Sequence, residues 1–252
     1  MSAATSMAAS NSSWDVEQRS YWSELSGDYD GFYRSRWSQL ENEWVAAKLC
    51  FLSELPSLPL ILDLGCGTGL GAKVASQWTR LDRYVGVDIA PEMARITSAT
   101  FGVETHVSAM DDLSWVEAES VDAVICLFSA ASFAGSPCRL FGEVARVLKP
   151  GGRAHISTLG RDLRRSPKRV RFRTRGHDSS ASVPARRFRP EHLQRLAAEV
   201  GLRVQAIEGM NSLSGICETA PLWRAGRLFA RAFPVTSHLL EMNCLKPTKD
   251  LR

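Results

Sequence analysis

The sequence predicts a doubly wound α/β domain, and three observations support this fold class. Segments expected to be strands recur along the middle of the chain, at 60–64, 84–88, 103–107, 121–128 and 153–159, and the first and fourth are apolar runs typical of buried parallel strands. Helical patterns separate these runs, at 72–78, 92–99 and 140–148. A glycine cluster follows the first run directly. Strands that alternate with helices form a mostly parallel sheet with helices on both faces.

Composition is consistent with a single globular chain that needs no metal or disulfide for stability. It has 252 residues, of which 44% are hydrophobic, enough to bury a sizeable core. Six scattered cysteines without a Cys-x-x-Cys pair argue against a zinc site and indicate a reducing, cytoplasmic compartment. The net charge of +4 does not by itself predict nucleic-acid binding. The longest nearly uncharged stretch, 123–135, is too short to span a bilayer.

Three regions follow from the pattern along the chain. Residues 1–13 are rich in Ser and Ala and are expected to be a frayed, disordered tail without the features of a secretory signal. Residues 14–55 combine an aromatic run with a helical apolar stripe and predict an N-terminal helical lid. Residues 56–252 are expected to be the core, with an Arg-rich insert at 161–188 and a helical insert at 209–237.

The alternation changes after the fifth strand. A helix is predicted at 191–200, and Gly201 is in the position of its C-terminal cap. Two further strands are expected at 202–207 and 239–245. Because a helical segment at 221–233 separates them, we expect them to form an antiparallel pair at the edge of the sheet.

The glycine cluster after the first strand carries the chemical information. An NAD fingerprint requires a further glycine where this chain has Leu70, and a phosphate-binding P-loop requires a Gly-Lys-Ser/Thr that is absent. The three glycines at 65, 67 and 69 allow a ligand to approach the backbone closely. Asp88 ends the next strand, where a carboxylate can accept both hydroxyls of a ribose; the alternative is an acid that begins the following helix.

Four segments in order resemble the class I S-adenosylmethionine-dependent methyltransferases, specifically the small-molecule branch of the ubiquinone-biosynthesis type. They are Ile-Leu-Asp-Leu-Gly-Cys-Gly-Thr-Gly at 61–69, Gly-Val-Asp-Ile-Ala-Pro-Glu-Met at 86–93, Ser-Val-Asp-Ala-Val-Ile-Cys at 120–126 and Glu-Val-Ala-Arg-Val-Leu-Lys-Pro-Gly-Gly at 143–152. The segment 189–202 matches the late helix of the family. The resemblance implies a Rossmann-like sheet, mostly parallel with an antiparallel edge strand, and S-adenosylmethionine as the cofactor.

The resemblance also implies a set of cofactor-binding residues: Asp63, Gly65, Gly67, Gly69, Asp88, Ile89, Met110, Asp111, Leu127 and Tyr29. Asp63 is expected to face the positively charged amino-acid end of the cofactor, or else to cap the loop. Where the family commonly has an acid for the adenine amino group, this chain has Ala109, so Asp111 is expected to substitute. The alternative for Asp111 is a solvated acid in a turn. Ile89 and Met110 are expected to flank the adenine ring.

Methyl transfer requires few catalytic side chains, because the sulfonium already activates the methyl group. A general base is needed only where the acceptor is protonated at neutral pH. The candidates are His155 on the fifth strand and Tyr33 in the aromatic run, with His106 and Tyr29 as further choices. A histidine within a strand is more often structural, so no catalytic residue is assigned. No metal site is expected.

The sequence therefore predicts a cytoplasmic methyltransferase that acts on a small-molecule, biosynthetic acceptor by in-line transfer. The alternatives are an RNA methyltransferase and a catalytically silent cofactor-binding scaffold. The Arg-rich insert is a solvated loop, a site for an anionic or carrier-bound substrate, or an RNA contact. The helix at 223–233 is expected to form a wall of the substrate pocket rather than a membrane contact. The identity of the substrate, its acceptor atom and the oligomeric state do not follow from the sequence.

Overall fold

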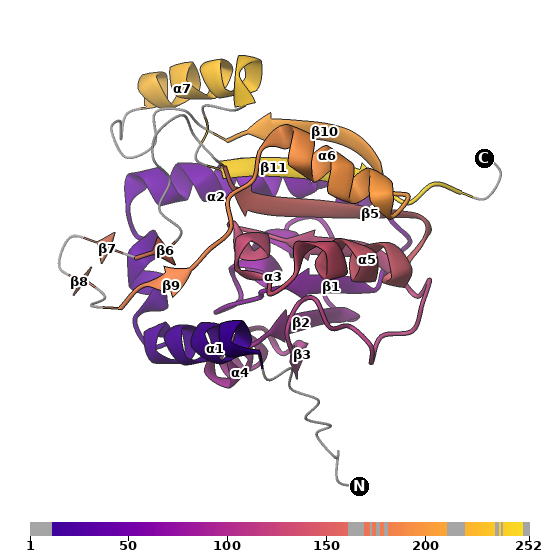
Figure 1. Cartoon of the computed structure of the whole chain (residues 1–252), viewed down its shortest axis with the longest axis horizontal. Coiled ribbons are helices and arrows are strands. Elements are labelled where there is room, and N and C mark those ends of the chain that lie inside the picture. Colours follow the sequence, from indigo (N-terminus) through magenta and orange to yellow (C-terminus); the bar gives the residue numbers. More distant parts are fainter. Residues whose placement is uncertain are drawn as a thin grey trace, which may run out of the picture.

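The computed structural model describes residues 12–160, 169–171, 173–174, 177–178, 181–210, 220–234, 237 and 239–248. Its centre is a seven-stranded sheet with the order β3-β2-β1-β4-β5-β11-β10 (Figure 1). The strands are β1 (Ile61–Leu64), β2 (Tyr84–Asp88), β3 (Glu104–Val107), β4 (Val121–Cys126), β5 (Leu148–Leu159), β10 (Arg203–Gly209) and β11 (Leu239–Leu245). Neighbouring strands pair parallel except at β11, which is antiparallel to both β5 and β10.

The predicted fold class is confirmed, and several strand limits differ from the expected ones, notably the start of β5 and the end of β4. β5 begins at Leu148, before the Pro-Gly-Gly turn that was expected to precede it. β4 ends at Cys126, because Phe128 and Ser129 adopt positive φ angles of 50° and 65° that no strand accommodates. The antiparallel pair is present, but β10 forms the edge and β11 lies one strand inside it.

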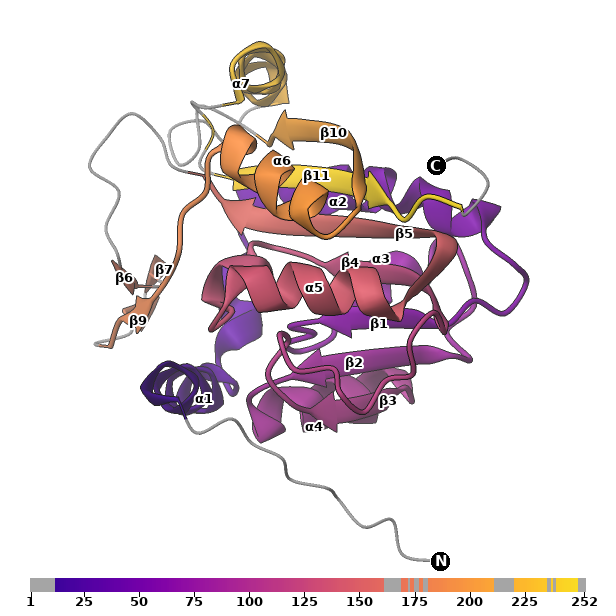
Figure 2. The ribbon, with the colours of Figure 1, turned by 45° about the vertical axis from the view of Figure 1, so that its right-hand side comes forward.

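Helices cover both faces of the sheet, as Figure 2 shows. On one face α5 (Pro137–Val147) and α6 (Pro190–Glu199) pack on even-numbered strand residues such as Leu62, Val124 and Ile156. On the other face α2 (Arg36–Lys48), the 3-10 helix η2 (Leu49–Glu54) and α3 (Leu70–Ala75) pack on odd-numbered residues such as Ile61 and Ile125. α4 (Pro91–Phe101) packs on β2 and β3. Burial of both faces explains the continuous apolar character of the central strands.

The N-terminal region divides into two parts with different positions. α1 (Ser13–Leu25) and the 3-10 helix η1 (Tyr29–Tyr33) extend over the open end of the sheet, whereas α2 and η2 are part of the core. Three side-chain hydrogen bonds fix α1, from Trp14 to the Phe133 carbonyl, from Gln18 to the Pro184 carbonyl and from Arg19 to the Ile89 carbonyl. Only the first half of the segment 14–55 is therefore in the position of a lid.

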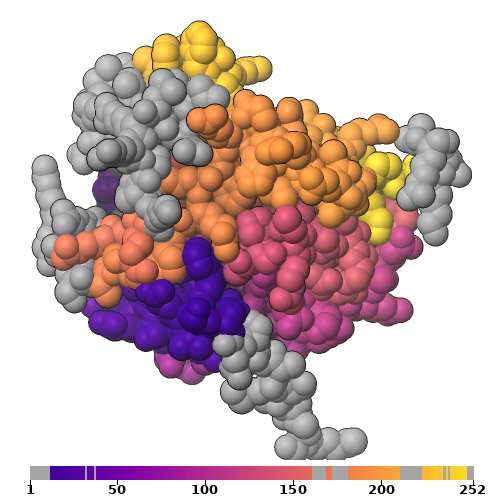
Figure 3. Space-filling model, in the orientation of Figure 1, coloured from indigo at the N-terminus to yellow at the C-terminus, as the bar shows by residue number. Residues whose placement is uncertain are grey.

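Part of the Arg-rich insert is described. β6 (Arg169–Val170) pairs with β9 (Val183–Pro184), and β7 (Arg173–Thr174) pairs with β8 (His177–Asp178). On the face seen in Figure 3, the indigo atoms of α1 lie against the orange atoms of the chain around β9. The rest of the insert, including Arg161, Arg164, Arg165, Lys168 and Arg175, lies outside the described residues, as does the 1–11 part of the expected tail.

The last helix, α7 (Ala220–Ala232), packs on β10 at the far edge of the sheet (Figure 1). It contributes no residue to the pocket described below, so the expectation that it forms a wall of that pocket is wrong. In the ranges that the structure describes, no helix has both the length and the apolar character needed to cross a membrane.

Candidate functional site

A pocket opens at the carboxyl ends of β1, β2 and β4, where ligands bind in open α/β sheets. It contains about 930 Å³ of empty space, with its open mouth included. Its floor is formed by the segments that follow β1, β2, β3 and β4, and α1 and η1 close one side. Nine of the ten expected cofactor-binding residues line it; Gly69 is the exception.

The glycine loop connects β1 to α3 through a backbone that only glycine adopts easily. Gly65, Gly67 and Gly69 have φ angles of 77°, 54° and 96°. A Cβ atom on Gly65 would lie 2.7 Å from the Cβ of Ala130, and one on Gly69 would lie 2.4 Å from the ring of Phe101. Gly69 thus positions the start of α3, while Gly65 and Gly67 bring the main chain to the pocket surface.

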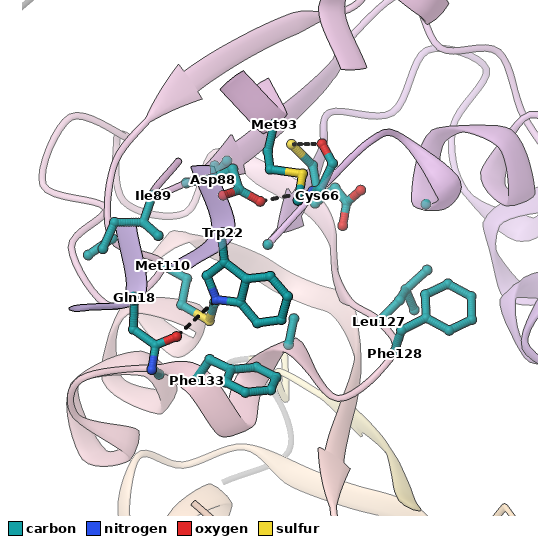
Figure 4. Close-up of a pocket in the computed structure, with 18 of the residues that line it drawn as sticks. Gln18, Trp22, Cys66, Asp88, Ile89, Met93, Met110, Leu127, Phe128 and Phe133 are labelled. Carbon is teal, nitrogen blue, oxygen red and sulfur yellow. Dashed lines mark hydrogen bonds between the residues drawn. The ribbon is translucent and has the colours of Figure 1, made fainter. Parts of the chain in front are cut away.

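Asp88 ends β2, and its carboxylate accepts a hydrogen bond from the glycine loop. One oxygen accepts the N–H of Gly67 at 2.9 Å and the other accepts the N–H of Ala90 at 2.9 Å, directly before α4. The same side chain therefore bonds to the main chain directly before α4 and faces the pocket (Figure 4). Burial raises the pKa of Asp88 to about 6, although the two N–H donors oppose this rise.

Asp63 lies on β1 below the loop and is almost fully buried. Its Oδ2 accepts a hydrogen bond of 2.5 Å from the hydroxyl of Tyr84 on the neighbouring strand. Burial raises the pKa of Asp63 to about 7, with the charge of Asp88 adding to the rise and the Tyr84 hydrogen bond opposing it. Asp63 forms no ion pair with any residue that the structure describes. A cationic group of a ligand would satisfy this carboxylate.

The segment after β3 contributes Met110 and Asp111. Asp111 is 4% exposed and its Oδ2 accepts the N–H of Ser136 at 2.8 Å, so it is a buried acid rather than a solvated one. Burial raises the pKa of Asp111. Figure 4 shows Asp88, Ile89 and Met110 grouped at one side of the pocket and Leu127 and Phe128 at the other.

Aromatic rings form a continuous wall above this floor. Trp22 packs edge-on against Phe133 with 5.0 Å between ring centroids and against Tyr29 with 6.0 Å. Tyr29 and Tyr33 share a hydrogen bond of 2.9 Å between their hydroxyls, and Tyr33 packs against Phe128. Burial raises the pKa of Tyr29 well above its ordinary value and that of Tyr33 to about 12, so both are neutral phenols at neutral pH. The side chains of Phe32 and Trp37 lie outside the described residues.

His155 does not lie at this pocket. It is fully buried within β5, where Nδ1 is 2.7 Å from Oδ1 of Asn243 and Nε2 is 2.8 Å from a carboxylate oxygen of Glu241. Both partners come from β11, so the imidazole joins two strands instead of meeting a substrate. His106 also lies outside the pocket, stacked on Trp115 with ring centroids 3.7 Å apart. The structure thus removes both histidines as general bases.

Sequence reasoning missed several pocket residues. Gln18, Phe128 and Phe133 line the pocket without belonging to any recognisable motif. Phe128 follows β4 at a positive φ angle, which turns its ring toward the site. The run Tyr21–Trp22 was the one available signal for the wall, since its aromatic density indicated that α1 packs on other rings.

Comparison with known proteins agrees with this geometry. Residues 62–156 match the family model of a methyltransferase domain. The matched segment is similar to the methyltransferase domain of the class I S-adenosylmethionine-dependent methyltransferases. The ubiquinone biosynthesis O-methyltransferase of Xanthomonas axonopodis pv. citri is 35% identical over 125 residues, which are 47% of this chain and 48% of that protein. The chain thus matches only about half the length of this curated methyltransferase.

Two solved structures show the same fold as this chain. An S-adenosylmethionine-dependent methyltransferase from Mesorhizobium loti has a TM-score of 0.57 at 18% identity, covering 81% of this chain and 97% of the other. The [4+2]-cyclase SpnF has a TM-score of 0.66 at 16% identity, covering 95% of this chain and 98% of the other. At these identities the likeness concerns the fold alone.

The charges of the residues that line the pocket indicate which cofactor the pocket fits. Four aspartates line it, at positions 15, 63, 88 and 111, and no lysine or arginine of the described chain does. A dinucleotide carries a pyrophosphate that this acidic surface would repel. S-adenosylmethionine instead carries a sulfonium and an ammonium group against a single carboxylate, so its net positive charge suits this acidic surface, and its ribose suits Asp88. The residues present therefore fit S-adenosylmethionine.

Proposed function

We propose that this protein transfers the methyl group of S-adenosylmethionine to a small, largely apolar acceptor, with a hydroxyl oxygen as the receiving atom. The observation that carries the proposal is that one pocket combines an acidic cofactor cradle with a wall of aromatic rings. The cradle suits the cofactor, and the rings of Trp22, Tyr29 and Phe133 suit a flat organic molecule beside it. The name of the curated relative, an O-methyltransferase, supports oxygen as the acceptor atom.

Each part of the cradle has a proposed role. Asp88 binds the ribose hydroxyls through its carboxylate, and the N–H groups of the glycine loop hold the adjoining part of the cofactor. Asp63 faces the ammonium group. Ile89 and Met110 contact the adenine ring, and Asp111 lies at its edge. Leu127 and Tyr29 border the reacting end. When bound, S-adenosylmethionine supplies a methyl group that its sulfonium has already activated.

The protein's own contribution to the reaction is alignment and exclusion of water. α1 and η1 cover the pocket, and the hydrogen bond from the Trp22 indole to Gln18 at 2.9 Å fixes the ring that faces the chamber. The paired hydroxyls of Tyr29 and Tyr33 can orient an acceptor hydroxyl. Because the pKa of Tyr33 is raised to about 12, it acts as a neutral hydrogen-bonding group and not as a phenolate base. No general base is assigned.

The described part of the Arg-rich insert has a structural role beside this site. Arg169 pairs with Glu17 on α1 and also donates to Ser182, so it ties the insert to the lid. Arg186 donates to the Gly135 carbonyl at 2.7 Å and lies over the ring of Trp14. We propose that an anionic or carrier-bound acceptor binds at the Arg-rich insert. Its turnover would then slow with added salt, because exposed charges are screened over about 10 Å.

We propose that the protein functions in a reducing compartment such as the cytoplasm. Free cysteines support this proposal, and those that the structure describes are at 50, 66, 126, 138 and 244.

Turnover with isotope-labelled S-adenosylmethionine tests the proposal. Purified protein is incubated with hydroxylated aromatic acceptors and, separately, with transfer RNA, and methylated products are identified by mass spectrometry. The proposal expects a methyl ether on an aromatic acceptor. Methylated RNA would favour the RNA methyltransferase, and tight cofactor binding with no product from cell extract would favour a silent scaffold. Conversion of an acceptor without transfer of the labelled methyl group would contradict the proposal; a cyclase shares this fold.

A matched pair of variants tests the assignment of the aromatic wall. Phe133→Ala is expected to raise the KM for the acceptor about tenfold or more, since burial of an aromatic ring against a ligand contributes on the order of 1–3 kcal/mol. Trp115→Ala is the control, because Trp115 stacks on His106 outside the pocket. Equal KM values for the two variants would show that Phe133 does not contact the acceptor.

A further inference from the structure

A second hollow lies on the other side of the molecule from the cofactor pocket. It is a groove bordered by α2 and η2, by the sheet at β5, β10 and β11, and by α7, with about 1040 Å³ of empty space including its open side. Arg153, one of its lining residues, pairs with Ala123 at the start of β4, so the groove lies near the amino ends of the parallel strands. The cofactor pocket lies at their carboxyl ends.

Three cationic side chains and two aromatic rings line this groove. The guanidinium of Arg227 lies 4.9 Å from the ring centroid of Trp44, and the ammonium of Lys48 lies 5.2 Å from the same ring. Arg153 lies 5.9 Å from the ring of Phe51. The groove therefore has a basic surface with apolar walls.

Two of the three cations already have a carboxylate partner. Lys48 pairs with Glu208 at 2.6 Å, and Arg153 pairs with Glu54 at 2.8 Å. Arg227 has no carboxylate within 4.0 Å in the described parts of the chain. Glu208 is near enough to act on its charge, while Arg231 on the same helix repels it, and burial lowers the pKa of Arg227. Arg227 is thus a half-buried charge without an ion-pair partner among the residues that the structure describes.

Two buried N–H donors at the same groove also have no acceptor. Nε of Arg227 and Nε1 of Trp44 are both inaccessible to solvent, and neither forms a hydrogen bond with the residues described. Trp44 as a whole is 5% exposed. Buried donors in folded proteins almost always have a partner. An Arg227 Nε–H and a Trp44 indole N–H that both lack an acceptor among the described residues of one groove favour an acceptor supplied by a ligand.

We propose that this groove binds a small anion, a molecule with a carboxylate or phosphate group, with Arg227 as its charged partner. The anion supplies both the missing negative charge and the missing acceptor for the Arg227 guanidinium. Trp44 and Phe51 provide apolar surface for the body of the molecule. The site is separate from the cofactor pocket, so the anion and the cofactor can be bound at the same time.

Binding of inorganic phosphate and of malonate tests the proposal. The thermal midpoint and the binding isotherm are measured with S-adenosylhomocysteine present throughout and with chloride used to hold the ionic strength constant. At least one of the two anions is expected to raise the midpoint in a saturating manner. Comparison of the two shows whether the groove prefers phosphate or carboxylate. No response beyond that of chloride to either anion would overturn the proposal.

Three variants locate the site. Arg227→Gln is expected to weaken anion binding at least tenfold and to leave cofactor affinity unchanged. Arg231→Gln removes the same charge from the same helix at an exposed position, and should retain binding within about twofold. Equal loss in both variants would show a general charge effect and contradict the proposal. If Arg227→Gln does not fold, Glu208→Gln is the deciding variant. It removes the carboxylate partner of Lys48 and should tighten anion binding severalfold. Unchanged or weaker anion binding in Glu208→Gln would contradict the proposal.

Discussion

The hydroxyl of Tyr84 donates a hydrogen bond of 2.5 Å to Oδ2 of Asp63, joining two neighbouring strands directly below the glycine loop. Tyr84 is the one hydrogen-bond donor to this carboxylate among the described residues, and no cation faces it. Because the carboxylate is buried and no positive charge lies beside it, the pKa of Asp63 is raised to about 7. A buried acid in this state makes the empty protein less stable and makes a cationic ligand bind more tightly.

Asp63→Asn is expected to stabilise the free protein at pH 8. In the wild type the folded-state pKa of about 7 lies above the ordinary value of 3.8, so the folded state binds the proton more tightly than the unfolded state. Stability from this group is therefore complete below about pH 4 and is lost as pH rises toward 7. The variant should gain roughly 2–4 kcal/mol at pH 8 in urea unfolding. Little change is expected for Asp82→Asn, an exposed acid beside Arg80. A less stable Asp63→Asn protein at pH 8 would contradict the account.

Cofactor affinity is expected to rise with pH between about 5 and 8. The roles proposed for Asp88 and Asp63 require ionised carboxylates, and their pKa values are raised to about 6 and about 7. Binding should therefore release protons, which calorimetry in two buffers of different ionisation enthalpy can count. Asp63→Asn should remove the part of the dependence near pH 7 and keep the part near pH 6. An affinity that is flat across this range would show that neither carboxylate changes its ionisation on binding.

Asp88→Ala is expected to weaken cofactor binding by roughly 1–3 kcal/mol, the range for polar partners left unpaired in a closed site. The loss includes the hydrogen bond that Asp88 accepts from Gly67. Asp111→Ala should cost less, because its carboxylate already accepts the N–H of Ser136 and because Asp111 lies two positions after Ala109, where the family commonly has the acid. A larger effect at Asp111 than at Asp88 would reverse the two assignments.

Gly69→Ala is expected to destabilise the fold more than Gly102→Ala. Both glycines have positive φ angles, 96° and 67°, so both substitutions carry the left-handed strain of roughly 1–2 kcal/mol. A Cβ on Gly102 meets nothing within 4 Å, whereas one on Gly69 collides with the ring of Phe101. Urea unfolding measures the difference. Equal losses would mean that Phe101 moves aside without cost.

The fold was predictable because the central strands are buried on both faces and therefore appear as largely apolar runs, such as 123–126 in β4. The limits of β4 were not, since its end is set by the positive φ angles of Phe128 and Ser129, and the N–H of Ser129 bonds to Ser157, 28 residues away in sequence. Such contacts leave no local pattern.

The floor of the site followed from the glycine spacing and from Asp88 at the end of the next strand. Its wall depends on contacts between distant segments, such as the hydrogen bond of Gln18 with Pro184, 166 residues away in sequence. His155 was a reasonable candidate only until its partners on β11 were known, because the pairing of β5 with β11 determines which side chains face the imidazole.

The central claim is that the acidic pocket at the end of β1 and β2 binds S-adenosylmethionine. Calorimetric titration of the wild-type protein at pH 8 with S-adenosylmethionine, S-adenosylhomocysteine and NAD tests it directly. We expect saturable binding of S-adenosylmethionine and S-adenosylhomocysteine and no binding of NAD. Asp88→Ala should weaken the binding of both S-adenosyl compounds. Binding of NAD together with no heat from S-adenosylmethionine would contradict it.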